Sequence, residues 1–98
     1  MLKAKKYEDV LFRFVNMDIA LELSGTVIVR HDAMAIDIPI NGRNTYVVVG
    51  STQDGFYDGR NNALEAPRVH ARWTKFGPVF AGRWLEEGVE YLFSFRLP

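Results

Sequence analysis

The side chains that could carry acid–base or metal chemistry are few and scattered in this sequence. The two histidines, His31 and His70, are far apart, and neither belongs to an HxH or HExxH pattern that would hold a metal ion. Glu86 and Glu87 are adjacent, so in a strand or turn their carboxylates point apart and do not form an acid–base pair. We therefore predict no metal site, no cofactor and no catalytic residue.

Nucleophiles and nucleotide-binding motifs are equally scarce. Cysteine is absent, which excludes a disulfide, a thiolate zinc site and a cysteine nucleophile. None of the serines lies in a Gly-x-Ser-x-Gly elbow, and neither Gly-x-Gly-x-x-Gly nor a P-loop is present. Nothing in the sequence supports an enzyme, and we lean toward a non-catalytic protein.

A basic stretch is the one local bias of charge. Arg68, His70 and Arg72 share one face of a strand-like run, and residues 60–83, beginning with Arg60, contain Glu65 as their only acid. Arginine presents a planar fork of donors that suits phosphate or an acidic partner. We favour the alternative of a solvated outer face, whose charges pair across strands with nearby acids: Glu86, Glu87 and Glu90.

Aromatic side chains are concentrated in the C-terminal third. Trp73, Trp84 and Tyr91 lie in successive strand-like runs, together with Phe93 and Phe95. In a small barrel such rings either fill the interior or line an apolar ligand cavity. We expect them to fill it, because a chain of 98 residues has little spare volume.

The run Phe80-Ala81-Gly82-Arg83-Trp84, followed by Gly88 and Tyr91, resembles the units of MORN repeats and the strands of lipocalin-like barrels. It does not recur at a fixed period, so it assigns no family. We expect Gly82 to let an aromatic ring from a neighbouring strand lie over it.

These side chains must be positioned by β-strands, because the dominant periodicity from Val10 onward is two. Val10, Phe12 and Phe14 alternate with outward positions. A helix competes over residues 5–17, because Tyr7 and Leu11 also lie about one helical turn apart. We favour the strand, since Phe and Val prefer pleated surfaces.

The middle of the chain predicts three more strands. Residues 21–29 alternate around Gly25, where we expect a bulge or bend. Residues 34–40 alternate up to Pro39, which should mark an edge or a strand end. Asn41-Gly42 predicts a hairpin turn to a strand over residues 45–50. That strand is apolar on both faces over residues 46–49, so we expect both faces to be covered.

Residues 51–65 interrupt the alternation with turn-forming pairs and predict a long loop. Asp54 and Asp58 lack the spacing of a calcium loop and are interpreted as turn formers. Phe56 and Tyr57 punctuate this stretch. It is the first place where we expect a functional site.

The predicted fold is all-β and mostly antiparallel: a small meander barrel or strongly curved sheet of six to seven short strands, with a short N-terminal helix as the open alternative. The C-terminal strands cover residues 68–75, 79–85 and 89–97. A single domain over residues 1–98 is expected from the length. The N-terminus lacks the apolar segment of a signal peptide, which favours a cytoplasmic protein with no membrane segment.

The leading functional hypothesis is a non-catalytic binding or interaction domain with a protein partner or a small apolar ligand. The alternative is a lipocalin-like carrier, or an enzyme, with its site in the barrel mouth. A third hypothesis is a homodimer formed through an exposed strand edge beside Leu92 and Leu97. The zero net charge argues against nucleic acid. The candidate binding residues are Phe56, Tyr57, Arg60, Arg68, His70, Arg72, Trp73, Trp84 and Tyr91.

Overall fold

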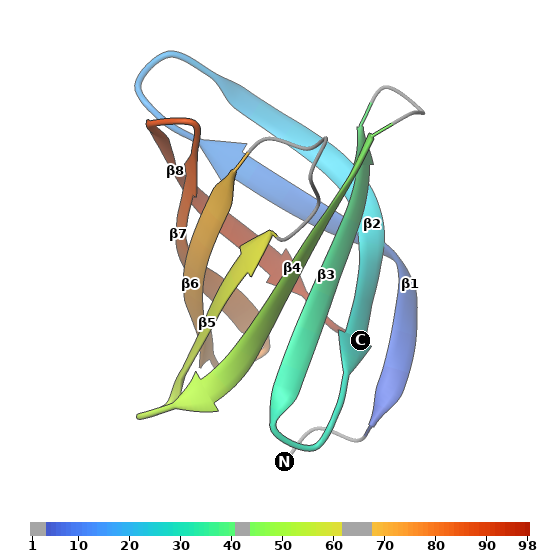
Figure 1. Cartoon of the computed structure of the whole chain (residues 1–98). Helices are drawn as coiled ribbons and strands as arrows, with labels where there is room; N and C mark the ends of the chain where they lie inside the picture. Colours follow the sequence, from blue (N-terminus) through green and yellow to red (C-terminus); the bar gives the residue numbers. More distant parts are fainter. Residues whose placement is uncertain (1–3, 41–43, 62–67) are drawn as a thin grey trace.

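The chain folds into one closed antiparallel barrel of eight strands (Figure 1). The computed structural model describes residues 4–40, 44–61 and 68–98, and these residues contain no helix. The prediction of a small all-β barrel is confirmed, with eight strands in place of six or seven. Their bounds are β1 Lys5–Val15, β2 Ala20–Val29, β3 Ala33–Ile40, β4 Asn44–Gln53, β5 Phe56–Asn61, β6 Val69–Phe76, β7 Val79–Glu86 and β8 Val89–Arg96.

The topology is a meander in which each strand pairs with the next. The barrel closes where Phe12–Val15 of β1 pairs with Leu92–Phe95 of β8. At Leu92, β8 therefore has β1 on one side and β7 on the other. The free edge that we expected beside Leu92 is absent, because closure removes it. Homodimerisation itself stays a prediction.

The first strand settles the choice between strand and helix over residues 5–17. The segment Lys5–Val15 is β-strand, so the helical alternative is wrong. Val10, Phe12 and Phe14 are buried inside the barrel, whereas Leu11 between them is half exposed. This period of two is the pattern of a strand with one face on the core.

A bulge lies close to the bend predicted at Gly25, but in the neighbouring strand. The β1–β2 register shifts between Tyr7 and Val10, where Asp9 has a positive φ of 57°. The extra residue in β1 lets the strand curve around the end of the barrel.

β4 is covered on one face only, although its apolar sequence predicted that both faces would be covered. Tyr46 and Val48 are buried, but Val47 and Val49 are 38% and 50% exposed. The expectation that both faces of this strand are covered is wrong. The second face is solvated because no layer packs outside the barrel wall, and β-branched residues are favoured in strands even where they face water.

β5 is the strand that the sequence analysis missed. The predicted long loop over residues 51–65 is instead the end of β4, a turn at Asp54-Gly55 and β5, with residues 62–65 outside the described ranges. Asp58 is a strand residue and not a turn former. Its neighbour Gly59 occupies an inward position, where a Cβ would contact the backbone of Val49. A glycine was therefore required where an apolar residue would have revealed the strand.

Tight turns connect the strands of two hairpins, β4–β5 and β7–β8. Asp54-Gly55 and Glu87-Gly88 both have positive φ at two successive residues, the conformation of a type I′ hairpin turn. The predicted turn at Asn41-Gly42 lies outside the described residues. The hairpin that it was expected to join is confirmed by the pairing of β3 with β4.

Aromatic rings pack against one another inside the barrel, and we call this cluster the aromatic body: Phe12, Tyr57, Trp73, Phe80, Phe93 and Phe95. Phe80 stacks on Phe95 with centroids 5.0 Å apart, and Trp73 stacks on Tyr57 at 5.8 Å. Phe93 contacts Trp73 edge-on at 5.8 Å. Such ring pairs stabilise the fold beyond their buried area by roughly 0.5–1.5 kcal/mol each. The expectation that these rings fill the interior is confirmed in the body.

Two glycines permit this packing. A Cβ on Gly50 would lie 2.8 Å from the Trp73 ring. A Cβ on Gly82 would collide with the Arg72 carbonyl oxygen of β6. The nearest atoms at Gly82 are therefore backbone, which shows a close approach of two strands, and the aromatic residue Phe93 of the neighbouring strand β8 is its register partner.

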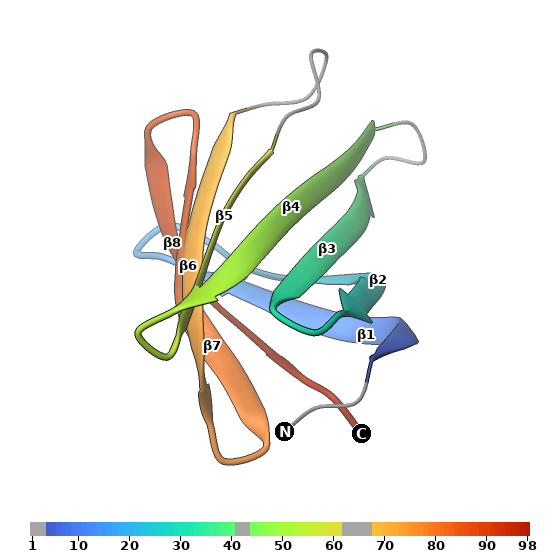
Figure 2. The ribbon, with the colours of Figure 1, turned by 60° about the horizontal axis from the view of Figure 1, so that its bottom comes forward.

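The opposite end of the barrel is splayed open. β2 pairs with β3 only from Thr26–Asp37 to Val29–Met34, so Ala20–Gly25 has no partner in β3. Figure 2 shows the β3–β4 hairpin diverging from the β1–β2 hairpin at this end. Pro39 lies beyond the last β2–β3 pair, which confirms its predicted place at an edge. No helical stretch in the described residues has the length and hydrophobicity to cross a bilayer.

Candidate binding sites

A pocket of about 240 Å³ occupies the splayed end, and we call it the mouth pocket. Its side chains come from five strands and meet only because the barrel closes. They are mostly aromatic or aliphatic, with one carboxylate. The residues that line it are Phe14, Leu21, Leu23, Tyr46, Trp84, Glu86 and Tyr91.

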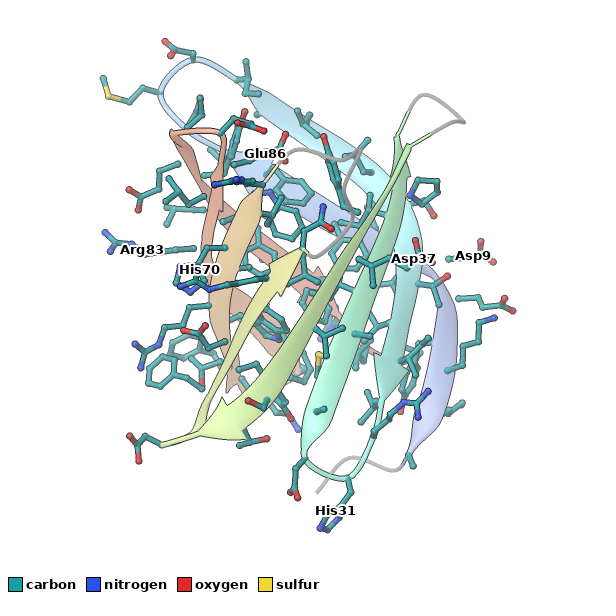
Figure 3. The ribbon with its side chains drawn as sticks, in the orientation of Figure 1. Asp9, His31, Asp37, His70, Arg83 and Glu86 are labelled. Atoms are coloured by element: carbon teal, nitrogen blue, oxygen red, sulfur yellow. The ribbon has the colours of Figure 1, made fainter. Side chains whose placement is uncertain are left out.

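Glu86 is the polar centre of the mouth pocket. Every second residue of β7 faces the barrel interior: Phe80, Gly82 and Trp84. Glu86 continues this series, so its half-buried side chain turns into the barrel rim. One oxygen, Oε1, accepts a hydrogen bond from the Trp84 indole Nε1 at 3.0 Å, and Oε2 accepts one from the Tyr46 hydroxyl at 3.2 Å. Figure 3 shows Glu86 at the upper end of the barrel, with His31 at the opposite end.

The electrostatics of the mouth pocket are negative. Burial raises the pKa of Tyr46 from 10.0 to about 12, and the neighbouring Glu86 carboxylate adds to this rise. A phenol next to a carboxylate resists becoming a second anion. Tyr46 is therefore a neutral hydrogen-bond donor to Glu86 over the ordinary pH range.

The rings of the mouth pocket stand at steep angles to one another. Phe14 meets Trp84 edge-on at 5.0 Å and 77°, and meets Tyr91 edge-on at 6.3 Å and 86°. Tyr46 tilts toward Trp84 at 6.4 Å and 53°. In an edge-to-face contact the edge of one ring lies against the face of the other, so these rings pack closely around the mouth pocket.

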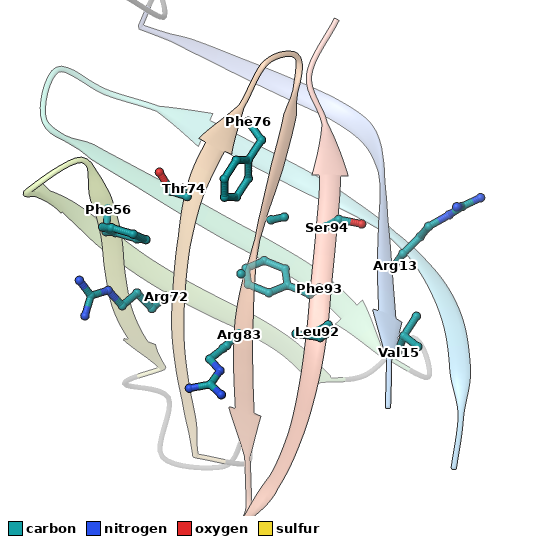
Figure 4. A pocket seen from close by; sticks show the side chains of 12 residues that line it. Arg13, Val15, Phe56, Arg72, Thr74, Phe76, Arg83, Leu92, Phe93 and Ser94 are labelled. Carbon is teal, nitrogen blue, oxygen red and sulfur yellow. The ribbon is translucent and has the colours of Figure 1, made fainter. Parts of the chain in front are cut away.

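A second, larger hollow of about 680 Å³ lies on the outside of the barrel, and we call it the outer groove (Figure 4). Phe76 and Leu92, which are each 65% exposed, form its apolar floor. Arginines border it, and no acidic residue lines it. The lining residues are Arg13, Val15, Phe56, Arg72, Thr74, Phe76, Ala81, Gly82, Arg83, Leu92, Phe93 and Ser94.

The basic residues of β5 and β6 are partly neutralised by local partners. His70 Nε2 lies 2.9 Å from Asp58 Oδ1 across the β5–β6 pair. The Arg72 guanidinium lies 4.5 Å over the Phe56 ring, a cation–π contact. The predicted pairing with acids of the last hairpin holds for Arg83 with Glu90 at 2.8 Å.

The other acids of that hairpin behave differently from the prediction. Glu87 accepts a hydrogen bond from the Arg68 backbone amide at 3.0 Å. Glu86 points into the mouth pocket and forms none of the ion pairs found among the described residues. The prediction that Glu86 pairs with the basic face is therefore wrong, because its parity places it inside the barrel.

The structure divides the nine predicted binding residues among four places. Phe56 and Arg72 border the outer groove. Tyr57 and Trp73 belong to the aromatic body, and of the predicted set only Trp84 and Tyr91 line the mouth pocket. The remaining three lie together on the outer wall beside Glu87: Arg60, Arg68 and His70.

Five residues of the mouth pocket were not among the predicted site: Phe14, Leu21, Leu23, Tyr46 and Glu86. One sequence signal could have found Glu86, because it shares the inward parity of Phe80 and Trp84 along β7. A charged residue on the apolar face of a strand indicates either a strand end or a functional group.

The fold is a small closed barrel with a packed body and an open mouth. Within the described ranges, no group of three or more His, Asp or Glu side chains could hold a metal ion. Comparisons with known protein families, curated proteins and solved structures find no match.

Proposed function

We propose that this barrel is a non-catalytic binding domain whose mouth pocket receives a small ligand or a group the size of a side chain. The observation that carries the proposal is the contrast inside the barrel: the body is packed ring on ring, whereas the mouth retains about 240 Å³ beside a fixed carboxylate. This volume is just below about 300 Å³, where pockets for drug-sized ligands begin. The occupant is therefore small.

The chemistry of the mouth pocket supports binding rather than catalysis. Its carboxylate is held by two hydrogen bonds to neutral donors, and its other walls are aromatic and aliphatic. An apolar pocket with a few fixed polar groups is the usual form of a ligand site.

Backbone-amide NMR with a panel of small neutral, cationic and anionic organic molecules tests the proposal. We expect at least one compound to shift the amides around Leu23, Tyr46 and Glu86. Leu23→Trp should fill the pocket and abolish the shifts, whereas Leu85→Trp, on the exposed face, should preserve them. Absence of any shift at the mouth across the panel would contradict the proposal.

The outer groove is a second candidate, for a protein partner. Its apolar side chains Phe76 and Leu92 are exposed. Two of its three arginines already have acidic partners, Arg13 with Glu22 and Arg83 with Glu90, whereas Arg72 lies over the Phe56 ring. Charge complementarity at Arg72 favours a partner segment that combines leucine with acidic residues. A short peptide of alternating leucine and glutamate should shift the amides of Phe76 and Leu92, and the matched leucine and lysine peptide should not. Equal amide shifts with the two peptides would contradict recognition by charge at the outer groove.

A further inference from the structure

We infer that the mouth pocket recognises an alkylated ammonium group, held between aromatic faces and the Glu86 carboxylate. This inference rests on the proposed function and adds the chemical class of the ligand. Two independent features carry it: the hydrogen-bond partners of the Glu86 carboxylate and the arrangement of the surrounding rings.

The first feature is a carboxylate that has hydrogen-bond donors but no cationic partner among the described residues. Glu22 and Glu90 each lie 2.8 Å from an arginine, whereas Glu86 forms no ion pair within the described residues. Its two hydrogen bonds come from an indole and a phenol, which are neutral. These donors orient the carboxylate without cancelling its charge. A half-buried anion without a counter-charge is stabilised by a cation that enters the pocket.

The second feature is the aromatic box around that charge. Phe14, Trp84 and Tyr91 meet at steep angles, and Tyr46 closes a further side. The face of each ring carries negative quadrupole charge, which attracts a cation placed over it. Aromatic boxes suit quaternary ammonium groups. Tyr91 is the most exposed ring of this box, whereas Trp84 is 1% exposed and contributes its N–H to Glu86.

The lining also distinguishes an alkylated ammonium from a bare one. Leu21 and Leu23 complete the walls. An unmodified ammonium is compact and strongly hydrated, so it would lose its water shell against these aliphatic walls. Methyl groups spread the charge over an apolar surface, which matches a wall of rings and leucines. A free quaternary amine and a methylated lysine side chain share this chemistry.

The direct test compares choline with the neutral alcohol in which a carbon atom replaces its nitrogen. The two molecules have the same shape and differ in charge. We expect isothermal titration calorimetry to give choline at least a tenfold lower Kd. Equal affinity, with both molecules mapped to the mouth by NMR, would overturn the cation assignment and leave the proposed function standing. If neither molecule nor the peptide described below shifts the mouth amides, both ideas fail.

Two variants on the same hairpin isolate the charge. Glu86→Gln keeps one of the two acceptor oxygens and removes the charge, so choline affinity should fall at least tenfold. Glu90→Gln is the matched control, because Glu90 is exposed and pairs with Arg83. Its affinity should stay within twofold of the wild type. Unchanged affinity in Glu86→Gln would overturn the role of the carboxylate. If that variant fails to fold, the choline and alcohol comparison decides on the wild-type barrel.

A peptide with a central trimethyllysine identifies the source of the cation. Tighter binding of the peptide than of choline supports a protein side chain as the occupant, and the reverse supports a free amine. The same peptide with unmodified lysine should bind at least tenfold more weakly. Equal binding of the two peptides would overturn the preference for alkylation.

Discussion

The two tryptophans of this chain are equally buried but have different partners, and they represent the two regions of the barrel. In the aromatic body, Trp73 donates its indole N–H to the Met34 sulfur at 3.3 Å, a weak acceptor. At the mouth, Trp84 donates to the Glu86 carboxylate at 3.0 Å. In the aromatic body, the indole N–H of Trp73 therefore has an acceptor that carries no charge. The mouth uses a carboxylate for the same purpose in an otherwise apolar pocket, which is the reason for our proposal that the mouth binds a ligand.

The largest effect should come from the body. Phe93 is 2% exposed and contacts rings from three other strands. Phe93→Ala should lower the free energy of unfolding by about 3–5 kcal/mol, because it leaves a cavity among rings. Urea unfolding measures this loss. Arg96→Ala, on the exposed face of the same strand, should cost less than about 1 kcal/mol, and equal costs would contradict the assignment of faces.

A smaller effect should come from the carboxylate at the mouth. Glu86→Ala leaves the Trp84 indole and the Tyr46 hydroxyl without their acceptor, which should cost about 1–3 kcal/mol. Glu86→Gln retains an acceptor and should cost less than about 1 kcal/mol. Both values come from denaturant unfolding under the same conditions. If Glu86→Ala were as stable as the wild type, the hydrogen bonds to Glu86 would contribute nothing to the fold.

The mouth should also respond to alkaline pH. The folded barrel holds the pKa of Tyr46 at about 12, above its ordinary value of 10.0. The unfolded chain therefore loses this proton first, and the stability contributed by Tyr46 is complete below pH 10 and lost as the pH rises to 12. Between pH 10 and pH 12, the free energy of unfolding should fall less steeply for Tyr46→Phe than for the wild type. An identical decline in both proteins would mean that Tyr46 titrates normally.

The smallest effect should come from the outer wall. The side chains of Arg83 and Glu90 are 76% and 51% exposed, although they lie 2.8 Å apart. Arg83→Ala should change the free energy of unfolding by less than about 1 kcal/mol, because solvent screens exposed pairs. Thermal unfolding at low and high salt measures it. A cost of several kcal/mol would show that the outer wall shares in the packing of the barrel.

The strands were predictable wherever an apolar residue marked every inward position. Phe12 and Phe14 in β1, and Phe93 and Phe95 in β8, are examples of this pattern, and all four are buried. β5 escaped prediction because its inward position at Gly59 must be empty to admit the backbone of Val49. A glycine demanded by close packing has the same sequence signature as a glycine in a turn.

The mouth pocket was less predictable than the strands. Phe14, Tyr46 and Glu86 are far apart in sequence and come together through closure of the barrel and the early end of the β2–β3 pairing. Periodicity reveals which face a residue occupies, but not its height in the barrel. The predicted residues Trp73 and Trp84 look alike in sequence, and only their heights place Trp73 in the aromatic body and Trp84 at the mouth pocket.

The most direct test of the contrast between body and mouth uses the two indole N–H signals of this chain in one NMR spectrum. Assigned through Trp73→Phe and Trp84→Phe, they report on the body and the mouth separately. During titration with choline we predict that the Trp84 signal shifts in a saturable way, while the Trp73 signal stays in place. A shift of the Trp73 signal alone, or saturable binding that moves neither signal, would contradict the assignment of binding to the mouth.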